Sequence, residues 1–565
     1  MQEIKEKIIA ELKNAGINAD ISMLEKPANL NLGDYALPCF SFAKELKKSP
    51  QEIAKEVQEK IKNKFTDFIL KTEVKGPYIN FFLKKELITE VLKEIHKCKQ
   101  DYGTFALNKK IVLIEGPSPN TNKPLHLGHV RNMAICKSLF NVMNAAGYEA
   151  KQINMNNNRG VHICKSMLAY KKWGKDDTPE KSGLKSDHFI AKYYVLFNKK
   201  AKENPELEQE IHEMLKKWEE GDKEIIELWK KMDKWASDGF KETYKIFNMS
   251  FDKEYYESEY YSHGREIILA GLKKGIFEKD EDGAIIINLE NEGLDKKVLL
   301  RADGTSVYVT QDIYLAKKKY KDFKYDKSIY VVGNEQTYHF QVLFKILKKL
   351  KFNSADGCYH FSYGMINLPE GRMKSREGTV VDADTLIEEV ISLAVKEIQK
   401  RYVSLDKKEI AERAKKIAMA AILFFILKYD PKKDFTYNPA ESLSFEGETG
   451  PYCQYVYARI QSIIRKSNVK AKENISFLGE EEKQILKLLS DYPAIVKKVS
   501  ESYKLSLIAR YVLELCQEFN NYYSKTKIIQ EDKELESARL YFIEAIAQVI
   551  ANALSLLGIE VLDVM

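Results

Sequence analysis

The sequence has few of the features that would place a protein outside the cytoplasm. Its seven cysteines lie far apart and none belongs to a Cys-x-x-Cys pair, which argues against structural zinc and against a disulfide framework. No continuous apolar run approaches the roughly 20 residues that span a bilayer. The first residues, MQEIKEKIIAELKNAGI, mix acids with lysines, unlike a signal peptide. We therefore expect a cytoplasmic protein with no membrane association and no zinc.

A strong excess of one charge is also missing. The 90 Lys and Arg residues exceed the 83 Asp and Glu residues by enough for a net charge of +7, which permits an RNA partner without indicating one. Most of these charges are expected on solvated helix faces. With 565 residues and 44% hydrophobic residues, the chain is long enough for three or four packed units, at about 100–200 residues each.

The order of patterns along the chain predicts three domains. The strand LNKKIVLIEG, a helix from about Leu127 to Ala146 and the strand YEAKQIN form a βαβ unit of a Rossmann-like α/β fold. Strand patterns return in GAIIINLE, TSVYVTQD, KSIYVVG and TVVDA. We expect an N-terminal α+β domain (1–105), a Rossmann-like domain (106–405) with a helical insertion at about 165–256, and a C-terminal all-α helical bundle (406–565).

The segment EGPSPNTNKPLHLGHVR, residues 115–131, carries the clearest chemistry. His126 and His129 are three residues apart where the helix begins, so both rings lie on one face. Gly128 between them lets a nucleotide approach the backbone, and the helix N-terminus favours phosphate. Two imidazoles there can hydrogen-bond phosphate oxygens. The alternatives are a buried histidine pair and a His-x-x-His metal site.

The string S-P-N-x-x-K-P-x-H-x-G-H-x-R resembles the HIGH motif of class I aminoacyl-tRNA synthetases, and its longer form is similar to that of arginyl-tRNA synthetases. The resemblance covers nearly the whole chain and thins out at about 171–245. It implies an enzyme that uses ATP with Mg²⁺ to convert L-arginine to arginyl-adenylate and transfers it to the terminal ribose of tRNA(Arg). It also implies that the activation step needs bound tRNA. Nothing in the sequence suggests a dedicated dimer arm, so we expect a monomer.

The segment GRMKSREG, residues 371–378, resembles the family's lysine-bearing KMSKS loop, with Ser375 where the second lysine is usual. By this resemblance, cations of the loop neutralise the leaving pyrophosphate, a methionine contacts ATP, and a lysine beside the histidines compensates for the missing one. These residues are Arg372, Lys374 and Arg376, then Met373, then Lys123. The alternative interpretation is a basic surface turn.

A guanidinium needs acids or a phenol in its plane, because unpaired donors are costly. The segment DGTSVYVTQD resembles the family's arginine-reading element. The resemblance implies that Tyr308, Asp312 and Glu115 contact the guanidinium. It implies that Ser118, Asn120 and Gln336 contribute to the rest of the arginine site and that His339 lies near the adenosine. The alternatives are a half-buried strand tyrosine for Tyr308 and a helix N-terminal acid for Asp312.

Two further segments resemble the family's RNA-binding parts. FEGETGPYCQYVYARIQSI, residues 445–463, resembles the helical anticodon-binding domain, which implies base contacts from Tyr452, Tyr455 and Tyr457 and a phosphate contact from Arg459. Aromatic residues at helical spacing are usually core, so we expect at least one of these tyrosines to be buried. GPYINFFL resembles the N-terminal domain that touches the tRNA D-loop, which implies roles for Asn80 and Phe82. Simple packing is the alternative for Phe82.

One segment departs from the family's common form. Where many members have G-D-W-G-x-Q, this chain has NNRGVH at 157–162, which leaves the roles of Asn158 and His162 open. Two rival functions remain, a class I synthetase of lysyl or glutaminyl type and a non-catalytic tRNA-binding relative. The acid at Asp312 and the N-terminal domain oppose the first, and the intact histidine motif opposes the second.

Overall fold

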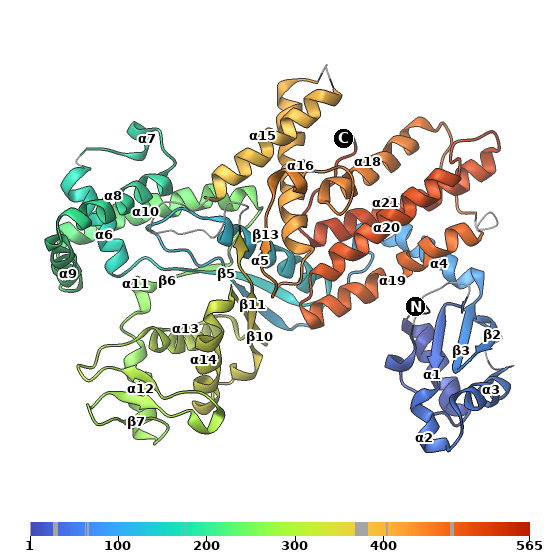
Figure 1. Cartoon of the computed structure of the whole chain (residues 1–565), viewed down its shortest axis with the longest axis horizontal. Helices are drawn as coiled ribbons and strands as arrows, with labels where there is room; N and C mark the ends of the chain where they lie inside the picture. Colours follow the sequence, from blue (N-terminus) through green and yellow to red (C-terminus); the bar gives the residue numbers. More distant parts are fainter. Residues whose placement is uncertain are drawn as a thin grey trace.

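The computed structural model describes residues 2–565 apart from 26, 28–31, 63, 65–66, 175, 368–381, 403–404 and 475–478. A parallel sheet lies at the centre of the molecule (Figure 1). Long C-terminal helices cover one side of it, and the N-terminal unit lies at the far end of these helices. The helical insertion and a second, smaller lobe extend from the other side. This arrangement confirms the predicted fold class.

The central sheet has five parallel strands in the order β11-β10-β4-β5-β6. The strands are β4 (Ile111–Glu115), β5 (Glu149–Asn156), β6 (Lys253–Tyr256), β10 (Lys327–Gly333) and β11 (Cys358–Tyr363). Apolar residues run almost continuously through β4 and β10 because helices cover both faces. The predicted helix is α5 (Leu127–Ala145), which joins β4 to β5. All carboxyl ends therefore meet at one edge, where α/β sheets bind ligands.

The helical insertion enters between β5 and β6. It consists of α6 (Val161–Trp173), α7 (Pro179–Ser182), α8 (Ser186–Glu203), α9 (Glu206–Glu219) and α10 (Lys223–Ile246). Its core is aromatic, with Tyr170, Phe189 and Trp235 packed edge to face. Helix α10 returns the chain to the sheet, so the insertion forms a separate helical body next to the strand ends (Figure 1).

A second lobe lies between β6 and β10. It contains α11 (Glu257–Tyr260), α12 (Gly264–Lys273), α13 (Tyr308–Phe323), α14 (Thr337–Lys349, after β10) and an antiparallel sheet of β7 (Glu278–Lys279), β8 (Ile285–Ile287) and β9 (Lys297–Leu300). The strand predicted for TSVYVTQD is wrong, because α13 begins at Tyr308. Val309, Ile313 and Ala316 are buried at helical spacing in the lobe's core, and this packing overrides the strand preference of the β-branched residues.

The N-terminal unit is an antiparallel sheet in the order β1-β3-β2 with helices packed against it. Its elements are α1 (Gln2–Asn14), β1 (Tyr35–Pro38), α2 (Ala43–Leu46), α3 (Pro50–Ile61), β2 (Ile69–Lys75) and β3 (Tyr78–Leu83). The predicted strands FILKTEVK and YINFFL form a hairpin that turns at Gly76, where φ is +60°. Helix α4 (Lys85–Cys98) then leads to the C-terminal helices, and His96 hydrogen-bonds the carbonyl of Tyr541.

The C-terminal part is helical apart from β13 (Phe435–Thr436), which pairs with β12 (Ile366–Asn367). Its helices are α15 (Ala383–Arg401), α16 (Lys407–Leu427), α17 (Pro439–Ser442), α18 (Gly450–Lys466), α19 (Glu480–Ser502), α20 (Ser506–Lys525) and α21 (Lys533–Leu556). Among the described residues, α21 alone is long and apolar enough to cross a membrane, but 67% of its most apolar window is buried inside the structure. It is the core helix of this bundle.

Candidate active site

The histidine pair lies at the mouth of α5, where β4 ends. His126 is the N-cap of the helix, and its Nδ1 accepts the N–H of Gly128 at 3.1 Å. The N–H of His126 in turn donates to Nδ1 of His129 at 3.1 Å. The two rings lie 4.0 Å apart between centroids. This reciprocal capping fixes both rings on one side of the helix mouth.

These contacts determine which ring nitrogens carry protons. Burial, followed by the charge of Lys123, lowers the pKa of His126 to about 4. Burial also lowers the pKa of His129 well below its ordinary value. Both imidazoles are therefore neutral at pH 7, and since each Nδ1 accepts a backbone N–H, each proton is on Nε2. The site offers two N–H donors for phosphate oxygens at a helix N-terminus.

The segment that follows residue 381 is held next to His126. Asp382 and His126 form a β-bridge, and the N–H of Ala383 donates to the carbonyl of Leu125 at 2.8 Å. Of the predicted loop cations, Arg372, Lys374 and Arg376, and of the predicted ATP contact Met373, nothing is described, because these positions lie within 368–381. The predicted strand TVVDA falls mostly in the same gap.

Arg131, the last residue of the histidine motif, has a structural role that the sequence did not predict. Arg131 is 1% exposed, and its guanidinium donates to the carbonyls of Gly364, Met365, Pro431 and Lys433. It also lies over the Phe435 ring at 4.7 Å. Arg131 therefore joins α5 to the β12–β13 pair, directly ahead of residues 368–381. Only a three-dimensional contact could identify this role.

The acids predicted to read arginine lie beside the nucleotide end of the sheet. Asp312 and Tyr308 share one face of α13, as predicted, and Tyr308 is 77% exposed at its first turn. Asp312 Oδ2 lies 2.7 Å from Nε2 of His339, the residue predicted near adenosine. This contact places the guanidinium candidate next to the adenosine candidate, so an arginine and an ATP bound there would be neighbours.

Glu115 has a different partner from the one expected. It is buried at the end of β4 and forms an ion pair with Lys319 of α13, whose ammonium is also 3.9 Å from the centre of the Tyr330 ring. Lys319 is 1% exposed, so the pair is shielded from water. In this structure Glu115 is therefore neutralised by the chain itself. Lys319 gave no signal in the sequence.

Glu257 is an acid within the electrostatic reach of Asp312 that sequence reasoning missed. Burial raises the pKa of Glu257 to about 7, against the opposing charge of Arg159 and with the charge of Asp312 adding to it. A carboxyl that is partly protonated at neutral pH, and whose pKa is raised further by the charge of a second acid, is suited to receive a cation. It lies in α11, a four-residue helix that has no sequence motif.

The remaining predicted contacts surround the same strand ends. Ser118 has a φ of +55° and donates its N–H to Asn154 at 3.0 Å. Asn120 forms a bridge with Asn157 and is exposed. Gln336 is exposed in the turn after β10, and Lys123 lies 5.3 Å from the centre of the Tyr194 ring. The structure brings all of them to the carboxyl edge of the sheet.

The two positions that the sequence left open differ sharply. Asn158 is buried and ties three segments together: its side chain bonds Asp233 of α10 and the N–H of Ser258, and its carbonyl accepts from Trp229. His162 is exposed on α6, with its ring 6.4 Å from Tyr194. Asn158 thus connects the insertion, through hydrogen bonds to α10, with the end of β5.

The predicted RNA contacts fall into an exposed and a buried group. Tyr452, Tyr455 and Tyr457 on α18 are all partly exposed, so the expectation of at least one buried tyrosine is wrong. Arg459 donates to Asn520 at 2.6 Å and to the Tyr455 hydroxyl at 3.1 Å. Asn520 in turn donates to the Tyr452 hydroxyl at 2.9 Å, which makes α20 part of this surface.

Asn80 and Phe82 form the buried group. They are 3% and 8% exposed in β3. Lys71 covers the Phe82 ring at 4.4 Å, and Lys483 of α19 approaches it at 5.8 Å. In this structure neither side chain is presented to an RNA, which favours the packing interpretation for Phe82. Their contact with tRNA stays a prediction.

The parallel sheet with paired histidines at the mouth of its first helix is the catalytic domain of a class I aminoacyl-tRNA synthetase, as a family match shows. The family model for the catalytic domain of class I arginine tRNA synthetases matches residues 87–438. The models for the arginyl tRNA synthetase N-terminal domain and the DALR anticodon binding domain match residues 2–83 and 453–565.

Related proteins agree over the full length. The chain is 45% identical to an arginine–tRNA ligase of Treponema denticola, over 100% of both chains, and 42% identical to one of Parabacteroides distasonis, over 99% of both. The arginyl-tRNA synthetase structure from Thermus thermophilus superposes with a TM-score of 0.85 and 26% identity over 100% of both chains. The chain belongs to the arginine–tRNA ligase family. It activates arginine and charges tRNA with it.

Proposed function

We propose that the residues at the mouth of α5 and in the pocket of α13 carry out this reaction. The arginine carboxylate attacks the α-phosphate of ATP, which enters with Mg²⁺ as part of the substrate. The bond to pyrophosphate breaks and arginyl-adenylate forms. The 2′-hydroxyl of the terminal tRNA ribose then attacks the arginyl carbonyl, and AMP leaves. No covalent enzyme intermediate is needed, because positioning and charge stabilisation supply the catalysis.

The observation that carries this assignment is the pair of neutral imidazoles at a helix mouth. Nε2–H donors of His126 and His129 would hydrogen-bond the phosphates and follow the charge that develops on them. Neutral donors bind phosphate without adding fixed positive charge. Lys123 supplies a cation beside them, and Arg372, Lys374 and Arg376 would assist as pyrophosphate leaves.

Arginine selection would rest on the acids of the second lobe. Asp312 and Tyr308 would contact the guanidinium, and the half-buried Glu257 would add negative charge once ionised. Glu115 would act at a distance, because Lys319 already neutralises it. Ser118, Asn120 and Gln336 would hold the α-amino and carboxylate end. A lysyl or glutaminyl substrate offers no planar array of five donors for this set of acids.

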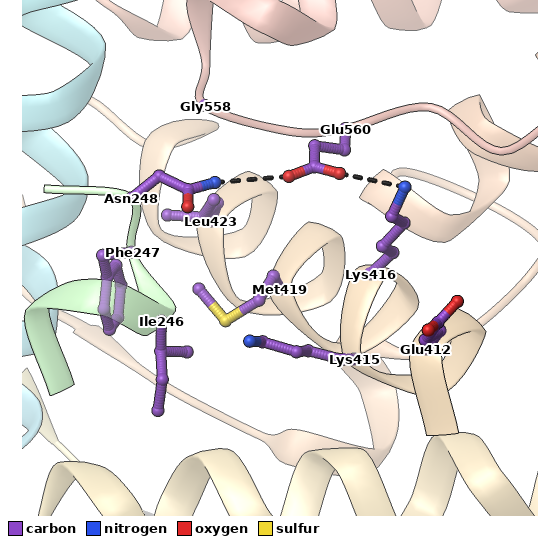
Figure 2. A pocket seen from close by; sticks show the side chains of 10 residues that line it. All are labelled: Ile246, Phe247, Asn248, Glu412, Lys415, Lys416, Met419, Leu423, Gly558 and Glu560. Carbon is purple, nitrogen blue, oxygen red and sulfur yellow. Dashed lines mark hydrogen bonds and ion pairs between the residues drawn. The ribbon is translucent and has the colours of Figure 1, made fainter. Parts of the chain in front are cut away.

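We also propose that bound tRNA is required for the activation of arginine, because the C-terminal helical bundle hydrogen-bonds α5, the helix that carries the histidines. Ser138 and Asn141 of α5 donate to the carbonyls of Leu556 and Ser555, at 2.9 and 2.8 Å. Figure 2 shows the chain after α21 bordering a neighbouring cavity, where Glu560 bonds Asn248 and Lys416. This cavity has a volume of about 210 Å³. RNA bound to the tyrosines of α18 would thus act on a body in direct contact with α5.

Exchange of labelled pyrophosphate into ATP tests both proposals. We expect exchange to depend on arginine and to need tRNA. Equally fast exchange without tRNA would contradict the tRNA requirement. An exchange rate that does not depend on arginine would contradict the assignment of the site. Replacing Asn141 with Ala should reduce the stimulation by tRNA while leaving tRNA binding intact, since the bond that it removes lies away from the RNA-binding surface.

We further propose that the enzyme is a cytoplasmic monomer with no zinc. The proposed functional units are residues 1–105 for D-loop contact, 106–405 for catalysis and 406–565 for anticodon binding. The order of the matched family domains, at residues 2–83, 87–438 and 453–565, supports this division. Sedimentation analysis of the purified chain tests the monomer, and metal analysis of the same sample tests the absence of zinc.

A further inference from the structure

A largely buried polar cluster, formed by Lys185, His188, Thr243 and Asp384, joins the helical insertion to the start of α15. Asp384 is the second residue of α15, and its Oδ2 accepts from Lys185 Nζ at 2.6 Å and from His188 Nε2 at 3.0 Å. Its Oδ1 accepts from the hydroxyl of Thr243 at 2.9 Å. Lys185 and His188 lie at the start of α8 and Thr243 on α10, so two helices of the insertion supply every one of these donors.

The cluster is charged and largely shielded from water. Burial acts to raise the pKa of Asp384, but the hydrogen bonds from His188 and Lys185 outweigh it and hold that pKa at about 2. The bond to Asp384 raises the pKa of His188 in turn. Thr243 is 0% exposed, and the side chain of Asp384 is 15% exposed. A carboxylate in this setting is held in one position by its donors.

A metal ion is an alternative occupant, because ligand atoms of Asp187, His188 and Asp384 lie within 4.8 Å of one another. Lys185 Nζ already lies 2.6 Å from Asp384 and 3.4 Å from Asp187. The ammonium occupies the place between the two carboxylates that a cation would take. The chain therefore supplies its own cation, and the cluster connects α8 and α10 of the insertion with α15.

Asp384, at the centre of this cluster, is one residue away from the backbone that borders the histidine pair. Residue 383 donates its N–H to the carbonyl of Leu125, and residue 382 is bridged to His126. Asp382 also caps α15 by accepting the N–H of Thr385 at 2.9 Å. A shift of Asp384 would move residues 382–383 and, through these backbone contacts, His126. The position of the His126 imidazole would therefore depend on the insertion.

We propose that Asp384 is a positioning residue for adenylate formation, through which Lys185, His188 and Thr243 of the insertion fix the backbone beside His126. The inference rests on the proposed role of His126 and gives the insertion a function in the activation step. A buried ion pair alone is weak support for stability. The placement next to His126 is what favours a role in catalysis.

The test compares pyrophosphate exchange in four variants, measured with tRNA present and with ATP and arginine varied separately. Asp384→Asn removes the charge, Thr243→Val removes a donor without changing the side-chain shape, and Thr243→Ser keeps the hydroxyl. Asp177→Asn is the matched control, because Asp177 also accepts from a lysine and a tyrosine of α8, at 2.9 Å each, but lies away from α15.

We expect kcat to fall ten- to a hundredfold in Asp384→Asn, the scale of a small misplacement of a catalytic group, while KM for arginine changes less than twofold. Thr243→Val should lose kcat in the same direction, and Thr243→Ser and Asp177→Asn should stay close to the unmodified enzyme. Thermal unfolding of each variant separates this effect from lost stability.

Two outcomes would overturn the inference while leaving the proposed function intact. One is a kcat for Asp384→Asn and Thr243→Val that equals that of Asp177→Asn. The other is a loss shared equally between kcat and KM for arginine, which would indicate general disruption. Failure of the unmodified enzyme to exchange pyrophosphate with arginine would instead overturn the proposed site, and this inference with it.

Discussion

Replacing Asp312 with Asn tests the arginine pocket most sharply. The change removes one negative charge and keeps an acceptor oxygen for His339, which lies 2.7 Å from the carboxylate. A hydrogen bond to a charged group contributes about 1.5–3 kcal/mol. The Asp312 side chain is 26% exposed, so solvent screening favours the lower half of this range. We expect a loss of about 2 kcal/mol, which corresponds to roughly a 30-fold rise in KM for arginine.

The assay is arginine-dependent pyrophosphate exchange with tRNA present. KM for ATP should change little, because the histidine pair is untouched. Asp322→Asn is the matched control on the same helix, since Asp322 is 15% exposed and pairs with Lys253 and Lys318 at the far end of α13. A KM for arginine within threefold of the unmodified enzyme, or an equal rise in the control, would refute the assignment of Asp312.

Three further predictions concern charge and protons. The pKa of Glu257 is about 7, and a bound guanidinium favours its ionised form. Arginine binding should therefore release protons, and its affinity should increase as the pH rises through 7. Calorimetry in buffers of different ionisation enthalpy measures this proton release, and detecting none would contradict the prediction. The folded-state pKa of His126, about 4, lies below its unfolded value of about 6.5, so its contribution is fully present above pH 6.5 and is lost as the pH falls toward 4. His126→Asn, which keeps an N-cap, should flatten the pH dependence of the unfolding free energy over that range by roughly 1–3 kcal/mol, and urea titrations that are unchanged would count against the buried neutral ring. Lys319→Met should destabilise the fold by about 3–5 kcal/mol by leaving Glu115 buried without a partner, and adding Glu115→Gln should restore part of the loss in thermal unfolding.

Local sequence patterns were enough to predict much of the fold. The βαβ unit was predictable because β4, α5 and β5 each have a clear period and a clear end. The second lobe was not recognised, since its strands are two to four residues long and α13 begins with β-branched residues that favour strands. Short strands leave too few residues for a period to show, and only burial against α12 and α14 decides the outcome.

The site divides in the same way. His126, His129 and Asp312 lie in contiguous motifs, so resemblance was able to locate them. Lys319 pairs with Glu115, and Glu257 feels the charge of Asp312, only because the fold brings distant segments together. No spacing in the sequence indicates these interactions. The buried states of Asn80 and Phe82 likewise depend on packing across the N-terminal sheet and α19.

The most direct measurement is the charging of total tRNA with each of the twenty amino acids in parallel, in the presence of ATP and Mg²⁺. If the two neutral imidazoles bind ATP beside the acids of α13, as proposed, arginine alone is attached, and His129→Asn abolishes the attachment without altering tRNA binding. Attachment of another amino acid at a comparable rate, or full activity of His129→Asn, would contradict the account.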